Sequence, residues 1–434
     1  MNIEQAKRRS APVNLQDAST FDYRAVLRPG DHIAWPQGTG EPVGLTRALM
    51  DQGGTLPPAT LVVGMVTSKT MSHANVERFD YLALNGAGGA RRAVALSGGR
   101  VIPGHVSQLP ALIGTRRIPV DVALVRVRPT EDPDVFSLGV MVDFVHELID
   151  AARVVVAEFD ERMPLTAHDA LIPRARITHL TRADQPEPAI PDPEPSEVDR
   201  QVARNVANLI PDRATVQFGV GSMPVAVCGA LRAHKDLGLH SGVISDVAVD
   251  LIEAGVVTNL YKGIDVGLTV TGGLFGTKRL NDYADRNPAL AMRRAIHTHS
   301  AATLLQLQAL HTINSAVAID LSGQVNSEVA GGRYVGAVGG QVDYVRGGRL
   351  SPNGRSIMAM ASTTPDGKHS KIVASLAAGQ PVTTARSDID LVVTEHGVAD
   401  LWGRDLHARA EALIAIAHPA FRDQLARDFE QTIS

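Results

Sequence analysis

A proline-rich acidic segment divides this chain of 434 residues. It runs from Gln185 to Glu197, reads QPEPAIPDPEPSE, and holds five prolines. Proline lacks an amide hydrogen and clashes with the preceding helical turn, so such a segment joins neither a helix nor a central strand. The chain is also longer than one hydrophobic core usually serves. We therefore predict an N-terminal domain over residues 1–184, a crossover over 185–197 and a C-terminal domain over 198–434.

Short β-branched runs alternate with helical patterns on both sides of this segment. The runs include residues 60–64 (TLVVG), 215–220 (TVQFGV) and 391–394 (LVVT). Residues 198–210 carry an apolar side chain at every fourth position, which makes one helical stripe. Residues 406–417 are rich in Ala, Leu and Arg and stop before a His-Pro pair, as a helix does. This alternation predicts α/β architecture with largely parallel sheets.

Composition narrows the class of protein. The net charge of −4 and the lack of a long basic run argue against nucleic acid as a partner. The N-terminus lacks the apolar core of a secretory signal, and no apolar run reaches the roughly 18 residues of a membrane span. The single cysteine, Cys228, lies among apolar residues and cannot form an intrachain disulfide. We expect a cytoplasmic protein with no membrane partner and with a buried, inert thiol.

Two glycine-rich loops are candidate binding elements. Residues 219–224 (GVGSMP) follow an apolar run and open a predicted helix, although the third glycine of a dinucleotide fingerprint is missing. Residues 336–341 (GAVGGQ) let backbone N–H groups approach a ligand closely. Gln341 adds a neutral amide that suits a carboxylate or a thioester carbonyl. The alternative interpretation of the first loop is that its glycines serve only the geometry of a strand–helix turn. The alternative for the second loop is a tight turn between two strands.

The histidines do not predict a metal site. His297 and His299 are two residues apart, which would put both on one face of a strand. No third ligand follows at a useful spacing and no HExxH motif is present, so we expect no metal. A Ser-His-Asp hydrolase is also disfavoured, because no GxSxG motif follows a strand.

Three carboxylates lie in or near a stretch that begins INSAVAIDL, namely Asp320, Glu328 and Asp343. If residues 316–321 form a strand, Asp320 lies on the same face as Ala318, about 7 Å along it. Asp320 or Glu328 is then placed to orient a water molecule. The alternative is that these acids are paired structurally at strand ends.

A series of short motifs runs along the chain in one order. They are FSLGVMVD (136–143), MPLT (163–166), QFGVG (217–221), DLGLHS (236–241), DLIEAGVV (250–257), FGTKRL (275–280), INSAVAIDLSGQV (313–325), VTTARS (382–387), VTEHGVA (393–399) and IAIAHP (414–419). In this order they resemble the acetyl-CoA hydrolase/transferase family, which includes the 4-hydroxybutyrate CoA-transferases. The resemblance extends over nearly the whole chain.

The resemblance implies two open α/β domains of CoA-transferase type, with the active site in the cleft between them, and a homodimer. It implies coenzyme A, as a short-chain acyl-CoA, and a carboxylate as substrates, without a metal. In such enzymes a glutamate attacks the thioester and forms a mixed anhydride. CoA then returns to give a glutamyl-CoA thioester, from which an incoming carboxylate takes the CoA.

The resemblance also implies a role for parts of this chain. It places the nucleophilic glutamate at position 318, where this chain has Ala318. Backbone N–H groups of Ile296 and Gly397 are the implied donors to the oxyanion. The implied CoA-binding residues are Ala295, His297, Thr298 and His299, and those at the acyl or carboxylate end are Gly339, Gly340 and Gln341.

The methyl group of Ala318 cannot form an anhydride, so the resemblance leaves several functions open. The chain is an active-site variant that traps an acyl-CoA complex, a thioesterase that uses water in the vacated space, or an acyl-CoA-binding protein without turnover. Recruitment of another carboxylate, such as Glu328, is a further alternative. All of them belong to acyl-CoA metabolism.

Overall fold

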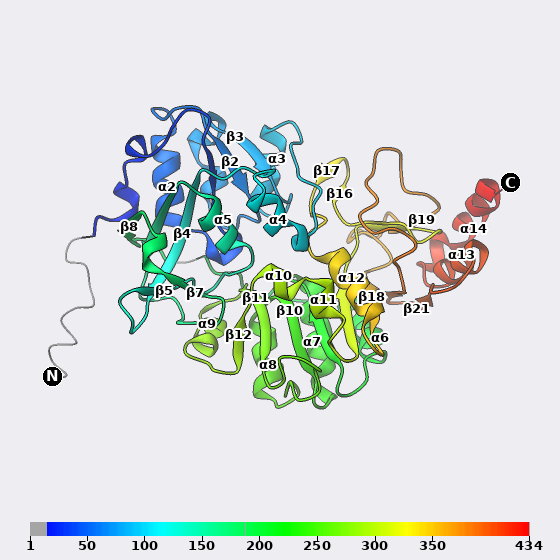
Figure 1. The fold of residues 1–434 in the computed structure, drawn as a ribbon. Helices are drawn as coiled ribbons and strands as arrows, with labels where there is room; N and C mark the ends of the chain where they lie inside the picture. The colour runs from blue at the N-terminus through cyan, green and yellow to red at the C-terminus, as the bar shows by residue number, and fades with distance from the viewer. Residues whose placement is uncertain (1–14, 187, 434) are drawn as a thin grey trace. The chain divides into compact units, whose positions relative to one another are not determined.

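The computed structural model describes residues 15–186 and 188–433 (Figure 1). By internal contacts the chain forms two compact units. The first unit holds the described residues up to 104 together with residues 108–190 and 272–295, and the second holds 105–107, 191–271 and the described residues from 296 onward. Residues 272–295 group with the first unit although they follow residue 198 in the chain. The linear division at the proline-rich segment stays a prediction.

The first unit is built on a parallel sheet with the strand order β3-β2-β1-β4-β6-β8. Two further strands extend it through antiparallel pairing from the end of β4. The strands of this sheet are β1 (His32–Ala34), β2 (Thr60–Val63), β3 (Asp80–Ala83), β4 (Val122–Pro129), β5 (Val135–Ser137), β6 (Val154–Phe159), β7 (Leu171–Pro173) and β8 (His179–Arg182). Strand β12 (Leu290–Met292) does not belong to this sheet and pairs with β11 (Thr269–Leu274). All residues of β6 are buried, as expected for a parallel strand that is covered on both faces.

Short helices flank the strands of this unit. They are α2 (Val43–Gln52), α3 (Ala90–Leu96), α4 (Leu109–Gly114), α5 (Val145–Ala151) and α9 (Lys278–Ala284). Strands and helices alternate along the chain, so the α/β prediction is confirmed for the first unit.

The second unit contains a second sheet, in which the strands follow the order β11-β10-β9-β13-β18-β20-β21. Every pair from β10 to β20 is parallel, and β21 returns antiparallel to β20. The strands are β9 (Thr215–Phe218), β10 (Gly238–Ile244), β11 (Thr269–Leu274), β13 (Leu310–Asn314), β18 (Arg355–Ala359), β20 (Leu391–Thr394) and β21 (Gly397–Asp400). The α/β prediction is therefore confirmed for this unit as well.

The helices of the second unit begin at the end of the proline-rich segment. Ser196 caps the first of them through a reciprocal pair of hydrogen bonds with Asp199. The helices are α6 (Glu197–Ala207), α7 (Ser222–Ala230), α8 (Asp246–Glu253), α10 (Ala295–Thr298), α11 (Ala301–Leu304), α12 (Gln341–Leu350), α13 (Leu406–Ala415) and α14 (Pro419–Ile433). The apolar stripe predicted for α6 is confirmed, because Val202 and Val206 are fully buried.

Helix α7 carries the single cysteine. Cys228 is fully buried, and burial raises the pKa of its thiol well above the ordinary value. The prediction of a buried thiol is therefore confirmed. Among the described residues, no helix has the length and apolar character needed to cross a membrane.

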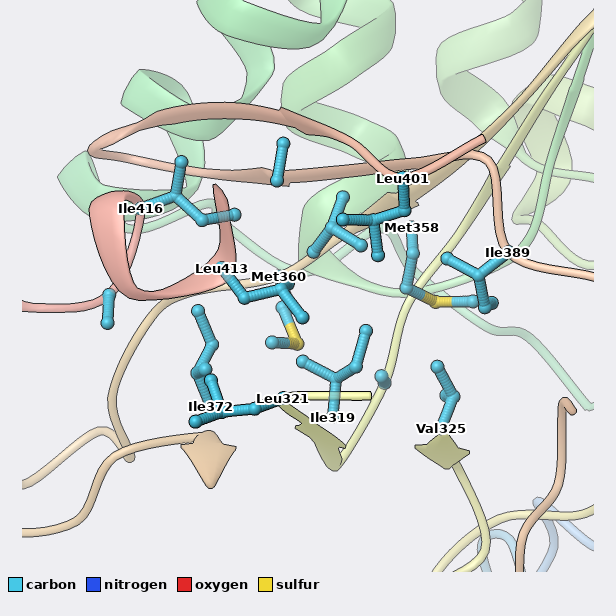
Figure 2. Packing of buried hydrophobic residues seen from close by; sticks show 14 of the residues in the cluster. Ile319, Leu321, Val325, Met358, Met360, Ile372, Ile389, Leu401, Leu413 and Ile416 are labelled. Atoms are coloured by element: carbon cyan, nitrogen blue, oxygen red, sulfur yellow. The ribbon is translucent and has the colours of Figure 1, made fainter. Parts of the chain in front are cut away.

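A small sheet packs against the second unit's main sheet through a shared apolar core. Its strands are β14 (Ala318–Asp320), β15 (Val325–Asn326) and β19 (Ile372–Val373), in the order β15-β14-β19. A two-stranded ribbon follows, β16 (Val329–Ala330) and β17 (Arg333–Tyr334). Figure 2 shows Ile319 and Leu321 among the residues of this core, together with Met360 and Leu413. Because side chains alternate along a strand, Ala318 lies on the opposite face from Ile319.

Candidate active site at the carboxyl ends of the second sheet

The strand order of the second sheet reverses at one point. From β9 the chain proceeds to β10 and β11 in one direction, whereas from β13 it proceeds to β18 and β20 in the other. Both β10 and β13 pair with β9 in parallel. In open parallel sheets, ligands bind beyond the carboxyl ends of the strands at such a reversal. The ends of β9 and β13 therefore mark the candidate site.

The loop after β9 is open at this point. Residues 219–221 connect β9 to α7, and a Cβ placed on Gly219 or Gly221 would meet no atom within 4 Å. Gly221 has a φ of +118°, which a larger residue rarely adopts. No side chain caps the start of α7, so its first N–H groups suit an anion or a developing oxyanion. Continuation of the β9–β10 register sets Gly242 beside Gly219.

The second glycine loop ends at a helix. Residues 336–340 connect β17 to α12, so the alternative of a turn between two strands is wrong. Gly339 has a φ of +55°, and Gly340 is the residue that precedes α12. Gln341 donates from Nε2 to Thr384 Oγ1 at 2.9 Å. The loop presents backbone N–H groups at the start of a ten-residue helix.

The ring of His299 joins the second loop to β10. A Cβ on Gly242 would lie 2.6 Å from its Cε1 atom, and a Cβ on Gly340 would lie 2.5 Å from its Nε2 atom. The ring also lies 4.8 Å from the ring of Tyr344, between centroids. His299 is 6% exposed, and burial lowers its pKa to about 3. Two glycines thus make room for one buried, neutral imidazole.

His299 directly follows a short helix that contains His297. His297 Nε2 lies 2.7 Å from Asp265 Oδ2, whereas His299 contacts the two glycines. The expectation for a strand, with both histidines on one face, does not apply, because α10 covers residues 295–298. The chain bends at His299, directly after this helix, and the two side chains have different partners.

Backbone contacts hold this helix in place. The Thr298 carbonyl accepts hydrogen bonds from His240 Nε2 at 3.1 Å and from the Tyr344 hydroxyl at 2.9 Å. Burial lowers the pKa of His240 to about 3, which keeps its ring neutral. Ala295 N–H donates to the Asp143 carbonyl at 2.7 Å, and Ile296 is 48% exposed. The two hydrogen bonds to the Thr298 carbonyl hold the backbone directly before His299.

Ala318 lies in β14, where it is half-buried and pairs with Asn326 of β15. The assignment of the nucleophile position to Ala318 stays a prediction. The observed strand, Ala318–Asp320, is shorter than the predicted 316–321. A chain of contacts leads from it toward the glycine loop, because Val325 bridges to Thr384, which accepts from Gln341.

The three candidate carboxylates differ in their surroundings. Asp320 accepts four hydrogen bonds from its own turn, and Asp343 accepts from Ser107 Oγ at 2.6 Å. Burial raises the pKa of Asp343 above its ordinary value. Glu328 is 4% exposed and accepts from Thr383 Oγ1 at 2.8 Å. Its backbone carbonyl accepts from the N–H of Gly336 at 3.2 Å, so Glu328 is tied to the start of the second glycine loop.

Gly397 begins β21 with a φ of +139°. Strands β13 and β18 separate β9 from β20, to which β21 pairs. At about 4.8 Å per strand, the four spacings from β9 to β21 put Gly397 about 19 Å of sheet away from β9. The structure thus groups His299, Gly339, Gly340 and Gln341 but gives no contact between them and Gly397.

Sequence reasoning missed two residues at this site. Gly242 lies at the carboxyl end of β10, and Asn314 ends β13, with Nδ2 3.4 Å from Gln217 Oε1. The strand order that brings these ends together is not visible in the sequence. A glycine directly after the DLGLHS motif, inside an apolar run, was the available signal for Gly242.

Known proteins resemble this chain in sequence and in fold. The model of the acetyl-CoA hydrolase/transferase C-terminal domain matches residues 276–429. The 4-hydroxybutyrate coenzyme A transferase of Clostridium kluyveri is 36% identical over 412 residues, which cover 94% of this chain and 96% of that protein. The acetyl-CoA hydrolase of Yarrowia lipolytica is 29% identical over 52% of this chain and 41% of its own length. The crystal structure of RipA from Yersinia pestis superposes with a TM-score of 0.89 at 28% identity, over 100% of both chains.

Proposed function

The chain belongs to the acetyl-CoA hydrolase/transferase family, an enzyme family of acyl-CoA metabolism, and we propose that it releases CoA from a short-chain acyl-CoA by attack of water. The acetyl-CoA hydrolase of Yarrowia lipolytica among the relatives supports water as the acceptor.

The observation that supports hydrolysis is the lack of a nucleophilic side chain at two strand positions. Gly242, at the carboxyl end of β10, has no side chain, and the family's implied nucleophile position holds Ala318. Neither residue can form an anhydride or a glutamyl-CoA thioester. The backbone donors of the two glycine loops and the carboxylate of Glu328 remain. Such a site suits an attack by water better than a covalent exchange.

The proposed reaction uses Glu328 as the general base. Glu328 takes a proton from a water molecule while the water oxygen bonds to the thioester carbon. Backbone N–H groups at the starts of α7 and α12 stabilise the resulting oxyanion. When the tetrahedral intermediate collapses, the carbon–sulfur bond breaks and the CoA thiolate takes the proton from Glu328. The products are CoA and a short-chain carboxylic acid.

A thiol-release assay tests the proposal. The protein is mixed with acetyl-CoA or butyryl-CoA, with and without acetate as an acceptor, and free CoA is measured over time. Release of CoA at the same rate with and without acetate is the expected result. Release that requires acetate would overturn the proposal in favour of CoA exchange. Tight binding of acyl-CoA without turnover over hours would instead show a binding protein.

Intact-protein mass spectrometry on the same samples provides a second readout. Hydrolysis by direct attack of water leaves the mass of the protein unchanged at every time point. A protein–CoA adduct would contradict the proposal and would identify a carboxylate that takes the role of the nucleophile.

A further inference from the structure

The proposed reaction leaves the ring of His299 without a chemical role. The ring is enclosed between the carboxyl end of β10 and the start of α12. A Cβ on Gly242 would lie 2.6 Å from Cε1 and 2.8 Å from Nε2, and a Cβ on Gly340 would lie 2.5 Å from Nε2 and 2.7 Å from Cδ2. Real Cβ atoms do not approach other atoms so closely, so only glycine at both positions accommodates this ring.

The two ends of the ring have different surroundings. Nδ1 lies 2.8 Å from Thr298 Oγ1, and the Thr298 carbonyl is held in turn by His240 and Tyr344. The close approaches to Gly242 and Gly340 both involve the Nε2 end of the ring. That end therefore lies where the glycine loop and β10 meet, beside the oxyanion donors at the start of α12.

The charge state of the ring decides what it can do. Burial lowers the pKa of His299 to about 3, so the ring is neutral at neutral pH. A neutral imidazole with such a low pKa is a poor proton acceptor but a good hydrogen-bond donor through one nitrogen. If the Thr298 hydroxyl donates to Nδ1, the single proton of the ring is on Nε2.

We propose that His299 donates a hydrogen bond from Nε2–H to the thioester carbonyl of the bound acyl-CoA. It is thus the side-chain member of an oxyanion site whose other donors are backbone N–H groups. The inference rests on the proposed function, since it names a donor for that same reaction. No proton is transferred by His299, because the hydrogen bond only strengthens as negative charge develops on the oxygen.

A matched pair of variants tests the donor. His299→Gln keeps an N–H donor near the position of Nε2, whereas His299→Asn keeps only the part of the side chain that corresponds to Nδ1. We expect His299→Asn to lower kcat for acetyl-CoA by about 100-fold to 1,000-fold and His299→Gln to stay within about tenfold of the wild type. Affinity for free CoA, which has no thioester carbonyl, stays unchanged in both. A role of the ring as a mere space filler would lower both variants alike or would weaken CoA binding.

A double-mutant cycle tests the same idea without removing the ring. Gly242→Ala places a methyl group against the ring and displaces it, so we expect a loss of kcat similar to that of His299→Asn. In the His299→Asn background, Gly242→Ala should cost little more, because the donor is already absent. Losses that multiply independently would overturn the inference. A cooperative melting transition above the assay temperature confirms that every variant is folded.

The outcomes separate the inference from the proposed function. If the wild type releases CoA without an acceptor but His299→Asn does so equally fast, only the inference fails. If the wild type shows no turnover, the proposed function fails. The role of His299 as a hydrogen-bond donor is then tested by ligand affinity instead of by kcat. The affinity for butyryl-CoA relative to CoA is then compared between the wild type and His299→Asn, and equal ratios overturn the inference.

Discussion

Two buried carboxylates in the same stretch of chain differ in the number of hydrogen bonds that they accept. Asp320, 2% exposed, accepts from the N–H groups of Ser322 and Gln324 at 3.0 Å each and from their side chains at 2.7 Å each. Glu328, 4% exposed, accepts a hydrogen bond from Thr383. A carboxylate has about four acceptor positions. Asp320 has used them to close its turn, whereas Glu328 retains capacity to accept a proton from water.

Removal of the Glu328 charge should have the largest effect on kcat and tests whether Glu328 differs from Asp320 in function. Glu328→Gln keeps an oxygen for Thr383 but no longer takes a proton from water. We expect kcat for acyl-CoA hydrolysis to fall by about 100-fold to 10,000-fold, with an unchanged melting temperature. Steady-state kinetics by thiol release measure the effect. A kcat within a few-fold of the wild type would show that Glu328 is structural, like Asp320.

A carboxylate at position 318, before both of these acids in the chain, should change the acceptor of the reaction. Ala318→Glu restores the residue that the family resemblance implies, and we expect a gain in acyl-CoA:acetate exchange of about 100-fold. A CoA adduct in the mass spectrum is the accompanying sign. Gly242→Glu combined with His299→Ala is the matched alternative, because it offers a carboxylate at the end of β10 in the space that the ring vacates. Exchange in the second variant alone would move the nucleophile position from 318 to 242.

Removal of the Asp320 charge should affect stability and not chemistry. Asp320→Asn replaces one acceptor oxygen by an amino group. That group faces the Gln324 side-chain donor if it takes the place of Oδ2, or three donors of the turn if it takes the place of Oδ1. We expect a loss of about 1–3 kcal/mol in the free energy of unfolding, measured by urea denaturation. The value of kcat at a temperature where the variant is folded should equal that of the wild type. A large fall in kcat would mean that Asp320, too, serves the reaction.

Removal of the Thr383 hydroxyl, which donates to Glu328, should have the smallest effect on kcat. Thr383→Val deletes the donor to Glu328 and the acceptor of the Ser327 N–H, which lies 2.9 Å from Oγ1. We expect kcat to fall by about tenfold, because the carboxylate is less well oriented. Thr383→Ser, which retains the hydroxyl, is the control and should keep kcat near the wild-type value. Equal rates in both variants would show that this hydrogen bond does not position Glu328.

The sequence predicted local elements better than the site. The run at 215–220 and the stripe at 198–210 correspond to β9 and α6, because burial on one or both faces leaves a periodic signal in the sequence. The reversal of strand order between β9 and β13 depends on pairing between distant segments, which no local period records. For this reason the meeting of His299 with Gly242 and Gly340 was not predicted. The motif series indicated the family, whereas the structure showed which residues lie beside His299.

The burial of Cys228 has a practical consequence for kinetic work on this protein. It is the chain's single cysteine, and its raised pKa leaves almost no thiolate at neutral pH. A chromogenic thiol reagent therefore reports the CoA product with almost no fast background from the protein. The slow labelling that remains requires α7 to open, so the same reagent measures how often this part of the second unit opens locally.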